Sequence, residues 1–342
     1  MRISGWWRGL APIAGALLLA GCGLQSGSSV PLPVGPGSIE PVAELDGVAV
    51  TVGSKDFTEA NILGYVIEFA LTAAGANVRD LTNIQGSNSL RDAQLNGQID
   101  IAYDYTGTGW INYLGNEKPV SAEDVNAAHP EQVSETDVER AQFEAVRAAD
   151  RAEHDMVWAA MAPMNNTYAL VTSRRTAQET GVRTLSDYAA LVATDPAAAE
   201  TCVGTEFNVR PDGYPGLAQK YGIDAGRAHK QIVQDALVYQ ATADATQCRF
   251  GSVAATDGRI PALDLVLLTD DKGFFPKYNA ALVMHGPFAD AHPRVAQLLA
   301  PISARLTNEV ITELNRQVDI DGREPAEVAR DWMVAEGLVT VD

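Results

Sequence analysis

Residues 48–75 read VAVTVGSKDFTEANILGYVIEFALTAAG, a strand pattern followed at once by a helix pattern. The β-branched run at 48–52 ends before a glycine and is typical of a buried strand. Apolar residues then recur at helical spacing between residues 62 and 74, and the glycine that follows predicts the end of that helix. Asp56 and Glu59 stand three residues apart and predict a capping box at the helix start.

The alternation of strand and helix continues toward the C-terminus. Residues 78–81 predict a second strand, residues 89–95 a short helix, and residues 99–103 a third strand. This order implies a parallel sheet with right-handed crossovers, in which ligands bind beyond the carboxyl ends of the strands. The loops at 53–56 and 104–108 fall at such ends, so we expect them to meet a ligand.

The rest of the chain carries the same mixed pattern, so the expected fold class is α/β. Further strands are predicted at 156–160, 168–172, 262–268 and 280–284, with another beginning at Cys202. Helices are predicted at 185–192 and, as two or three amphipathic segments, within 293–338.

The composition is that of a folded, strongly acidic protein. Its 342 residues are 46% hydrophobic and 20% charged, which excludes a disordered chain and favours two lobes over one compact domain. With 25 Lys and Arg against 44 Asp and Glu, the net charge is −19, so we expect no nucleic-acid partner. No apolar run of about 18 residues follows the N-terminal segment, which predicts no internal transmembrane helix.

The N-terminal segment carries an export signal. Residues 10–20, LAPIAGALLLA, follow a short basic region and have the length of a signal-peptide core. They lead into LAGC at 19–22, which resembles a bacterial lipobox, so residues 1–22 are expected to be a lipoprotein signal peptide that ends at a lipidated Cys22. An ordinary signal peptide with a chance cysteine is the alternative. The lipid predicts a protein anchored on the extracytoplasmic face of the cell membrane, and the Gly-, Ser- and Pro-rich residues 23–46 predict a flexible tether.

Two cysteines remain in the exported part of the chain. Cys202 and Cys248 form an even pair in an oxidising compartment, so we predict a disulfide, with two buried thiols as the alternative. The five histidines show no ligand spacing with one another or with the cysteines, so we expect no metal site. No cofactor is expected either.

The sequence lacks the common signatures of catalysis. It contains no G-x-x-x-x-G-K-[ST] phosphate loop, no G-x-S-x-G elbow and no H-E-x-x-H motif. Tyrosines and a few Lys and Arg side chains stand near predicted strand ends, and these residue types suit the binding of a cation and of a carboxylate. We therefore expect a binding protein without catalytic residues, not an enzyme.

Short motifs are spread along the chain from residue 48 onward. They are VGSKDFTE at 52–59, DYTGT at 104–108, NNTYAL at 165–170, RPDG at 210–213, TDGR at 256–259 and DDKGFFP at 270–276. In this order they resemble the osmoprotectant-type (OpuAC-like, ProX-like) substrate-binding proteins of ABC transporters. Each motif is short, and their shared order carries the resemblance.

The resemblance implies a type II periplasmic-binding-protein fold, in which two Rossmann-like α/β lobes close over a small ligand in a cleft. The first lobe is expected to comprise residues 47–160 and 260–342, and the second residues 161–259. Members of that family bind glycine betaine, choline or related solutes and deliver them to a membrane permease with its ATPase. The resemblance implies the same partners here, and we expect a monomeric protein.

In that family a quaternary ammonium group lies in a box of tyrosines, while a carboxylate meets Lys, Thr and Arg. Aromatic faces attract such a cation without hydrogen bonds, at roughly 0.5–2 kcal/mol for each ring. The matching positions here are Lys55, Thr108 and Arg210 for the carboxylate and Tyr105, Tyr168 and Tyr278 for the box, with Asn166 near the cationic group.

One departure from the family pattern concerns the size of the ligand. Ala254 stands where the family commonly has a box tyrosine, two residues before Thr256. Either Tyr214, Tyr239 or Trp110 fills the gap, or the box is open on that side. Two alternatives follow: the same scaffold binds a different, bulkier solute, or the protein is a contact-dependent extracytoplasmic sensor.

Overall fold

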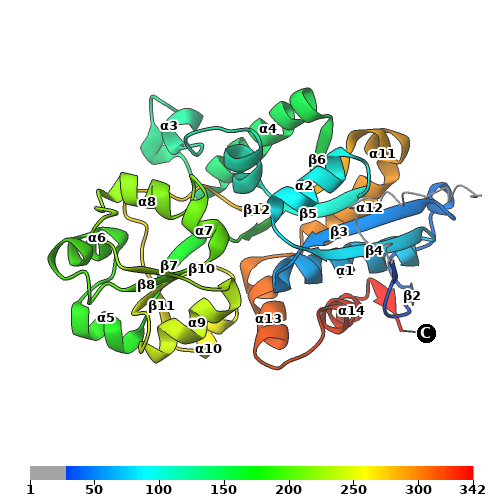
Figure 1. The fold of residues 1–342 in the computed structure, drawn as a ribbon. Helices are drawn as coiled ribbons and strands as arrows, with labels where there is room; N and C mark the ends of the chain where they lie inside the picture. Colours follow the sequence, from blue (N-terminus) through cyan, green and yellow to red (C-terminus); the bar gives the residue numbers. More distant parts are fainter. Residues whose placement is uncertain (1–27, 342) are drawn as a thin grey trace, which may run out of the picture.

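The computed structural model describes residues 28–341 and contains two large β-sheets, each covered by helices (Figure 1). The first sheet with the helices packed on it is called the first lobe, and the second sheet with its helices is called the second lobe. The first sheet has the strand order β1 (Ser28–Ser29), β4 (Asn77–Ile84), β3 (Ala49–Lys55), β5 (Ile101–Tyr105), β12 (Asn279–His285) and β6 (Met156–Asn165). The second has the order β11 (Leu265–Leu267), β7 (Tyr168–Ser173), β10 (Phe250–Ala254), β8 (Thr201–Val203) and β9 (Lys230–Ile232). A small sheet pairs β13 (Val339–Thr340) with β2 (Gly35–Pro36).

The helices of the first lobe are α1 (Thr58–Ala73), α2 (Ser87–Leu95), α3 (Ala122–Val125), α4 (Glu135–His154), α11 (Gly286–Ala291), α12 (Pro293–Ser303), α13 (Asn308–Asp319) and α14 (Pro325–Ala335), with short turns η1 (Ala43–Leu45), η2 (Thr108–Tyr113) and η3 (Pro130–Gln132). Those of the second lobe are α5 (Arg174–Thr180), α6 (Leu185–Thr194), α7 (Thr205–Val209), α8 (Tyr214–Tyr221), α9 (Asp235–Asp244) and α10 (Arg259–Ala262). The expected α/β class is confirmed.

The first sheet is mixed, not wholly parallel. β3 pairs in parallel with β4 and β5, as the strand–helix order predicts, but β12 runs antiparallel between β5 and β6. Successive residues of a strand face opposite sides of a sheet. Leu282 accordingly packs in the core with α1, whereas Val283 packs in the core with α4. Both faces of the sheet are therefore buried.

A disulfide ties together the second lobe. Cys202 on β8 is bonded to Cys248, which lies just before β10, and their Cα atoms are 5.5 Å apart. β8 and β10 are parallel neighbours, so the bridge joins adjacent strands. The predicted pairing is confirmed.

The chain crosses between the lobes twice. The first crossing lies between β6 and β7, and the second between β11 and β12. β11 pairs with β7 in the second sheet, although the sequence assigned residues from 260 onward to the first lobe. Its apolar sequence suits a buried strand of either sheet, so the strand pattern alone could not select the lobe.

Residues 28–46 are attached to the first lobe, and the prediction of a flexible tether is wrong for this part of 23–46. β1 pairs with β4, and Val34, Ile39 and Leu45 are buried in the core of the first lobe. These three side chains stand at irregular intervals in a Gly- and Pro-rich segment, so they give no periodic signal. Cys22 and the predicted signal peptide lie outside the described residues. Within residues 28–341, no helix combines the length and hydrophobicity that a membrane span needs.

The predicted capping box at the start of α1 is not formed. The residue before the helix is Phe57, and no side chain caps the helix there. Asp56 instead accepts a hydrogen bond from the backbone N–H of Gly86, at 3.1 Å. Glu59 points into the protein interior, where it has other partners.

Candidate functional site

The site begins where two parallel strands of the first lobe end. Lys55 is the last residue of β3, Tyr105 is the last residue of β5, and Thr108 starts η2 three residues later. The carboxyl ends of parallel strands lie at the same edge of a sheet. The Lys55 ammonium group accordingly lies 5.1 Å from the centre of the Tyr105 ring.

The second lobe and the two crossings supply the other predicted residues. Asn166 and Tyr168 lie at the first crossing, and Tyr278 lies at the end of the second. Arg210 follows α7 directly. The Arg210 guanidinium group lies 5.7 Å from the centre of the Tyr168 ring, which in turn packs edge-on against Tyr278 at 5.4 Å.

Contacts across the lobes join these groups into one set. Arg210 Nη2 lies 3.5 Å from Thr108 Oγ1, and the backbone carbonyl of Tyr278 accepts from the Asn166 N–H at 3.1 Å. At Gly107 an added Cβ would lie 2.6 Å from the Tyr278 ring, so the turn before Thr108 can approach the ring only with glycine. All seven predicted residues are brought together. We call them the interlobe cluster: Lys55, Tyr105, Thr108, Asn166, Tyr168, Arg210 and Tyr278.

Both cations of the interlobe cluster are held in ion pairs. Lys55 Nζ lies 2.7 Å from Asp104 Oδ1, and Arg210 Nε and Nη2 contact the two carboxylate oxygens of Asp212 at 2.8 and 2.5 Å. All four side chains are buried. The Tyr278 hydroxyl donates a further bond to Asp212. Neither aspartate is among the predicted site residues, although each stands within a quoted motif.

A third overlooked carboxylate, Glu59, lies beside the interlobe cluster and is 2% exposed. Its oxygens accept hydrogen bonds from the Tyr105 hydroxyl at 2.7 Å and from Asn166 Nδ2 at 2.9 Å. Burial raises the pKa of this carboxyl above its ordinary value, while the hydrogen bonds that it accepts act in the opposite direction. Its place in the VGSKDFTE motif was the available signal.

Two phenylalanines add aromatic surface next to the predicted tyrosines. The Phe207 ring lies edge-on to Tyr168 at 5.1 Å, and the Phe57 ring lies 5.9 Å from Tyr105. Phe57 is 38% exposed, so part of its ring faces solvent beside the buried Tyr105 ring. Phe57 belongs to the VGSKDFTE motif, whereas Phe207 lies outside every quoted motif.

Of the three aromatic residues expected to compensate for Ala254, Tyr239 lies next to it. The backbone N–H of Ala254 donates to the Tyr239 hydroxyl at 3.3 Å, and the guanidinium group of Arg259 lies 3.9 Å from the Tyr239 ring centre. Tyr214 is instead buried in the core of the second lobe, and the Trp110 indole donates to the carbonyl of Lys118. A cation of the protein thus already occupies one face of Tyr239.

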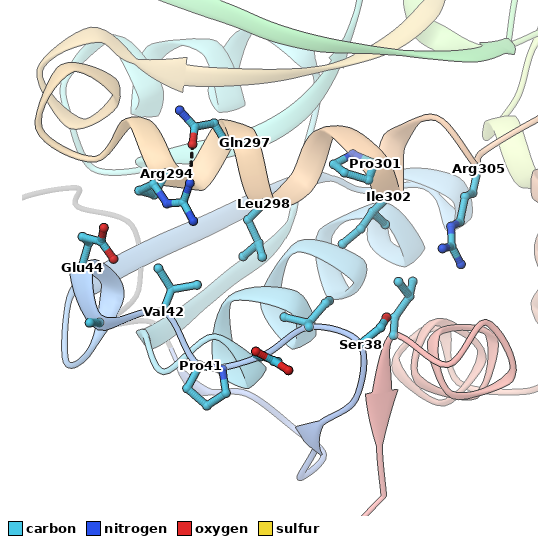
Figure 2. Close-up of a pocket in the computed structure, with 14 residues that line it drawn as sticks. Ser38, Pro41, Val42, Glu44, Arg294, Gln297, Leu298, Pro301, Ile302 and Arg305 are labelled. Atoms are coloured by element: carbon cyan, nitrogen blue, oxygen red, sulfur yellow. Dashed lines mark hydrogen bonds between the residues drawn. The ribbon is translucent and has the colours of Figure 1, made fainter.

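Elsewhere among residues 28–341, we find no better candidate. No three His, Cys, Asp or Glu side chains in that range are grouped to hold a metal ion. A groove of about 540 Å³ lies between residues 38–44, α12 and Leu338, and none of the predicted site residues lines it (Figure 2). Its arginines already have partners, because Arg294 bonds to Gln297 and Arg305 pairs with Glu336. We assign this groove no ligand.

Comparison with known proteins places this chain among solute-binding proteins. The family OpuAC, described as the substrate binding domain of ABC-type glycine betaine transport system, matches residues 48–335. A glycine-betaine-binding protein of Pseudomonas aeruginosa is 33% identical over 287 residues, covering 82% of this chain and 86% of that protein. The ergothioneine transport permease/ergothioneine binding protein of Helicobacter pylori is 27% identical over 290 residues, covering 84% of this chain and 48% of that protein.

The solved structures confirm the fold. The structure of apo YehZ from Escherichia coli has a TM-score of 0.60 and 25% identity, and the match covers 85% of this chain and 99% of that chain. The arrangement of two sheets with two crossings is therefore that of the type II periplasmic binding proteins. The chain belongs to the OpuAC family, the substrate-binding proteins of ABC-type glycine betaine and osmoprotectant transporters, and it is a solute-binding protein, not an enzyme.

Proposed function

We propose that this chain is a lipid-anchored, extracytoplasmic substrate-binding protein that captures a quaternary-ammonium solute between its two lobes. The interlobe cluster is the observation that carries the proposal, because it gathers aromatic rings and paired charges from both lobes at one place. A solute that contacts both lobes favours the closed arrangement, and a permease with its ATPase would then receive it from that state.

The aromatic groups suit a cation that cannot donate ordinary hydrogen bonds. A trimethylammonium group carries its charge on methyl groups, so it gains from ring faces more than from polar atoms. Tyr278 and Phe207 each pack edge-on against Tyr168, so three aromatic rings lie together between the lobes and could line a site for such a cation.

The charges favour a cationic or zwitterionic solute over a simple anion. Lys55 and Arg210 already have Asp104 and Asp212 as partners, and Glu206 lies 3.5 Å from Arg210. An anion would meet these carboxylates and gain little. A solute with separate positive and negative groups can instead share the two ion pairs, each end meeting the opposite charge.

A bulkier betaine is the second candidate, and Ala254 favours it. Ergothioneine carries a trimethylammonium group and a carboxylate like the smaller betaines, with an imidazole-thione ring in addition. Ala254 leaves room where the family commonly has a tyrosine ring, and Tyr239 beside it already has Arg259 on one face. The preference for a small or a large solute would then depend on Ala254 and Tyr239, which lie next to the interlobe cluster at Tyr168.

Isothermal titration with glycine betaine, choline, carnitine and ergothioneine tests the ligand class. We expect at least one of them to bind, and Tyr168→Ala to weaken that binding by at least about tenfold through loss of a ring. Matched solutes separate charge from shape: glycine keeps the charges of glycine betaine without its methyl groups, and 3,3-dimethylbutanol keeps the shape of choline without its charge. Absence of heat with all four solutes, or equal binding of the matched analogue, would refute the proposal.

The membrane anchor needs a separate test, because Cys22 lies outside the described residues. The LAGC sequence supports lipidation, which would hold the folded domain at the extracytoplasmic face. We expect the full-length protein to sediment with membranes and to incorporate an alkyne-labelled fatty acid. Cys22→Ser should abolish both, while Cys202→Ser with Cys248→Ser should abolish neither. Membrane association that survives Cys22→Ser would exclude this anchor.

A further inference from the structure

The buried carboxylate of Glu59 is hydrogen-bonded to residues of the first lobe, of the first crossing and of the second lobe. Glu59 Oε1 accepts from the Tyr105 hydroxyl and from Asn166 Nδ2, at 2.7 and 2.9 Å. Glu59 Oε2 accepts from Thr256 Oγ1 at 2.6 Å and from Asn315 Nδ2 at 3.2 Å. Each oxygen therefore has two donors, which is the full use of a buried carboxylate.

The four donors come from four separate parts of the fold. Tyr105 ends β5 in the first lobe and Asn315 lies on α13, whereas Asn166 lies at the first crossing and Thr256 follows β10 of the second lobe. The donors are also bonded among themselves: the Thr256 N–H donates to Asn166 Oδ1 at 3.3 Å, and Asn315 Nδ2 donates to the Thr256 carbonyl at 3.1 Å. Thr256, Glu59 and Tyr105 therefore form one continuous chain of hydrogen bonds from the second lobe to the first.

We propose that Glu59 is a positioning residue that couples the orientation of the Tyr105 ring to the hinge between the lobes. This inference rests on the proposed function, since the Tyr105 ring is a predicted wall of the solute site. Glu59 holds the hydroxyl of that ring at one oxygen and the second lobe, through Thr256, at the other. The ring reaches its binding position when Thr256 reaches its closed-state position, so solute affinity and lobe closure change together.

Glu68 on the same helix provides the contrast. It is also a buried glutamate on α1, but neither of its oxygens accepts a hydrogen bond among the described residues, and it lies outside the interlobe cluster. Burial in a helix therefore does not by itself produce the four-donor arrangement of Glu59. Glu68→Gln is a matched control for the replacement of a buried carboxyl group on α1 by an amide.

A double-mutant cycle on solute affinity tests the coupling. Glu59→Gln places an amide nitrogen against two of the four donors, and Tyr105→Phe removes the hydroxyl while it keeps the ring. We expect each change to weaken binding by about fivefold to tenfold, and the double variant to bind no more weakly than Glu59→Gln alone. Glu68→Gln should leave affinity unchanged. Independent effects that multiply in the double variant would overturn the proposal.

Hydrogen exchange measured without solute tests the hinge role of Glu59 independently of solute binding. We expect Glu59→Gln to accelerate exchange in the segments 166–168 and 254–257, and Glu68→Gln to leave them as in the wild type. If no solute binds the wild type, the proposed function fails, and this exchange result alone decides whether Glu59 restrains the hinge. Unchanged exchange would refute the hinge role. Should Glu59→Gln not fold, Thr256→Val removes one donor from the second lobe and is expected to give the same two results.

Discussion

At the scale of single residues, Glu68 is a buried carboxyl group close to a second acidic side chain, Asp80. It is fully buried on α1, and neither oxygen accepts a hydrogen bond among the described residues. Burial, and then the negative charge of Asp80, raise the pKa of Glu68 from 4.5 to about 9. The folded state therefore keeps a proton that the unfolded chain releases above its ordinary pKa, so stability falls as the pH rises between these two values.

We predict that Glu68→Gln is more stable than the wild type at pH 8 by roughly 5 kcal/mol and nearly equal to it at pH 4. The neutral amide keeps the shape of the protonated carboxyl and has no charge to bury. Urea unfolding at a series of pH values measures the difference. Glu144→Gln, an exposed change on α4, should give a curve parallel to the wild type. Parallel curves for Glu68→Gln as well would show that the proton is not retained on folding.

The guanidinium group of Arg210 forms a two-point hydrogen-bonded ion pair with Asp212. Nε and Nη2 meet both oxygens of Asp212, which a lysine ammonium cannot reproduce. We predict that Arg210→Lys weakens solute binding by at least about tenfold while the charge is kept. Titration calorimetry checks this, with the peripheral Arg249→Lys as the control that keeps its affinity. Equal affinity in Arg210→Lys would mean that charge alone matters there.

At the scale of elements, the N-terminus of α2 is capped by a carboxylate of the other lobe. α2 has no side-chain cap of its own, and its first residue, Ser87, donates from its N–H and its Oγ to the carboxylate of Glu206 at 2.9 and 3.2 Å. Glu206 lies on α7 of the second lobe. A negative charge stabilises a helix N-terminus, so this contact between the lobes stabilises the arrangement that the structure describes.

We predict that Glu206→Gln opens the unliganded protein. Loss of the charged cap costs about 1 kcal/mol, which shifts the ratio of closed to open molecules roughly fivefold. Small-angle X-ray scattering without solute should give a larger radius of gyration for this variant than for the wild type. Glu179→Gln, which removes an exposed carboxylate within the second lobe, should not change the radius. An unchanged radius for Glu206→Gln would mean that other contacts hold the lobes together.

At the scale of the whole molecule, the two ends of the described chain meet. β2, near the N-terminal end, pairs with β13 at the C-terminal end, and both lie against the first lobe (Figure 1). Val34, Ile39 and Leu45 bury their side chains there. Residues 28–46 are therefore a structural part of the first lobe, and the free length of any tether is shorter than residues 23–46.

We predict that a chain beginning at residue 47 is less stable than one beginning at residue 28 by at least about 3 kcal/mol, because three buried apolar side chains are lost. Thermal and urea unfolding of the two shortened proteins provide the comparison. The protein that begins at residue 28 should match one that begins at residue 23. Equal stability of all three would show that residues 28–46 add nothing to the first lobe.

Local patterns in the sequence predicted the first strands and helices and the cysteine pair, whereas the residues of the interlobe cluster were predicted from the family resemblance of the motifs. The β-branched run of β3, the helical spacing in α1 and the lone cysteine pair are each readable over short stretches, because they depend on period and count. Lys55 and Arg210 were predicted because each stands within a short motif, and the motifs follow one another in the same order as in the family.

Which buried polar groups bond to one another depends on how the fold brings distant segments together. The pairing of Lys55 with Asp104, the four donors on Glu59 and the cap that Glu206 provides to α2 all join segments that are distant along the chain. A spacing pattern reports the neighbours of a residue along one element, whereas a buried charge is satisfied by whatever the folded chain brings within hydrogen-bond distance. For the same reason, the antiparallel insertion of β12 and the burial of residues 28–46 became visible only when both sheets were assembled.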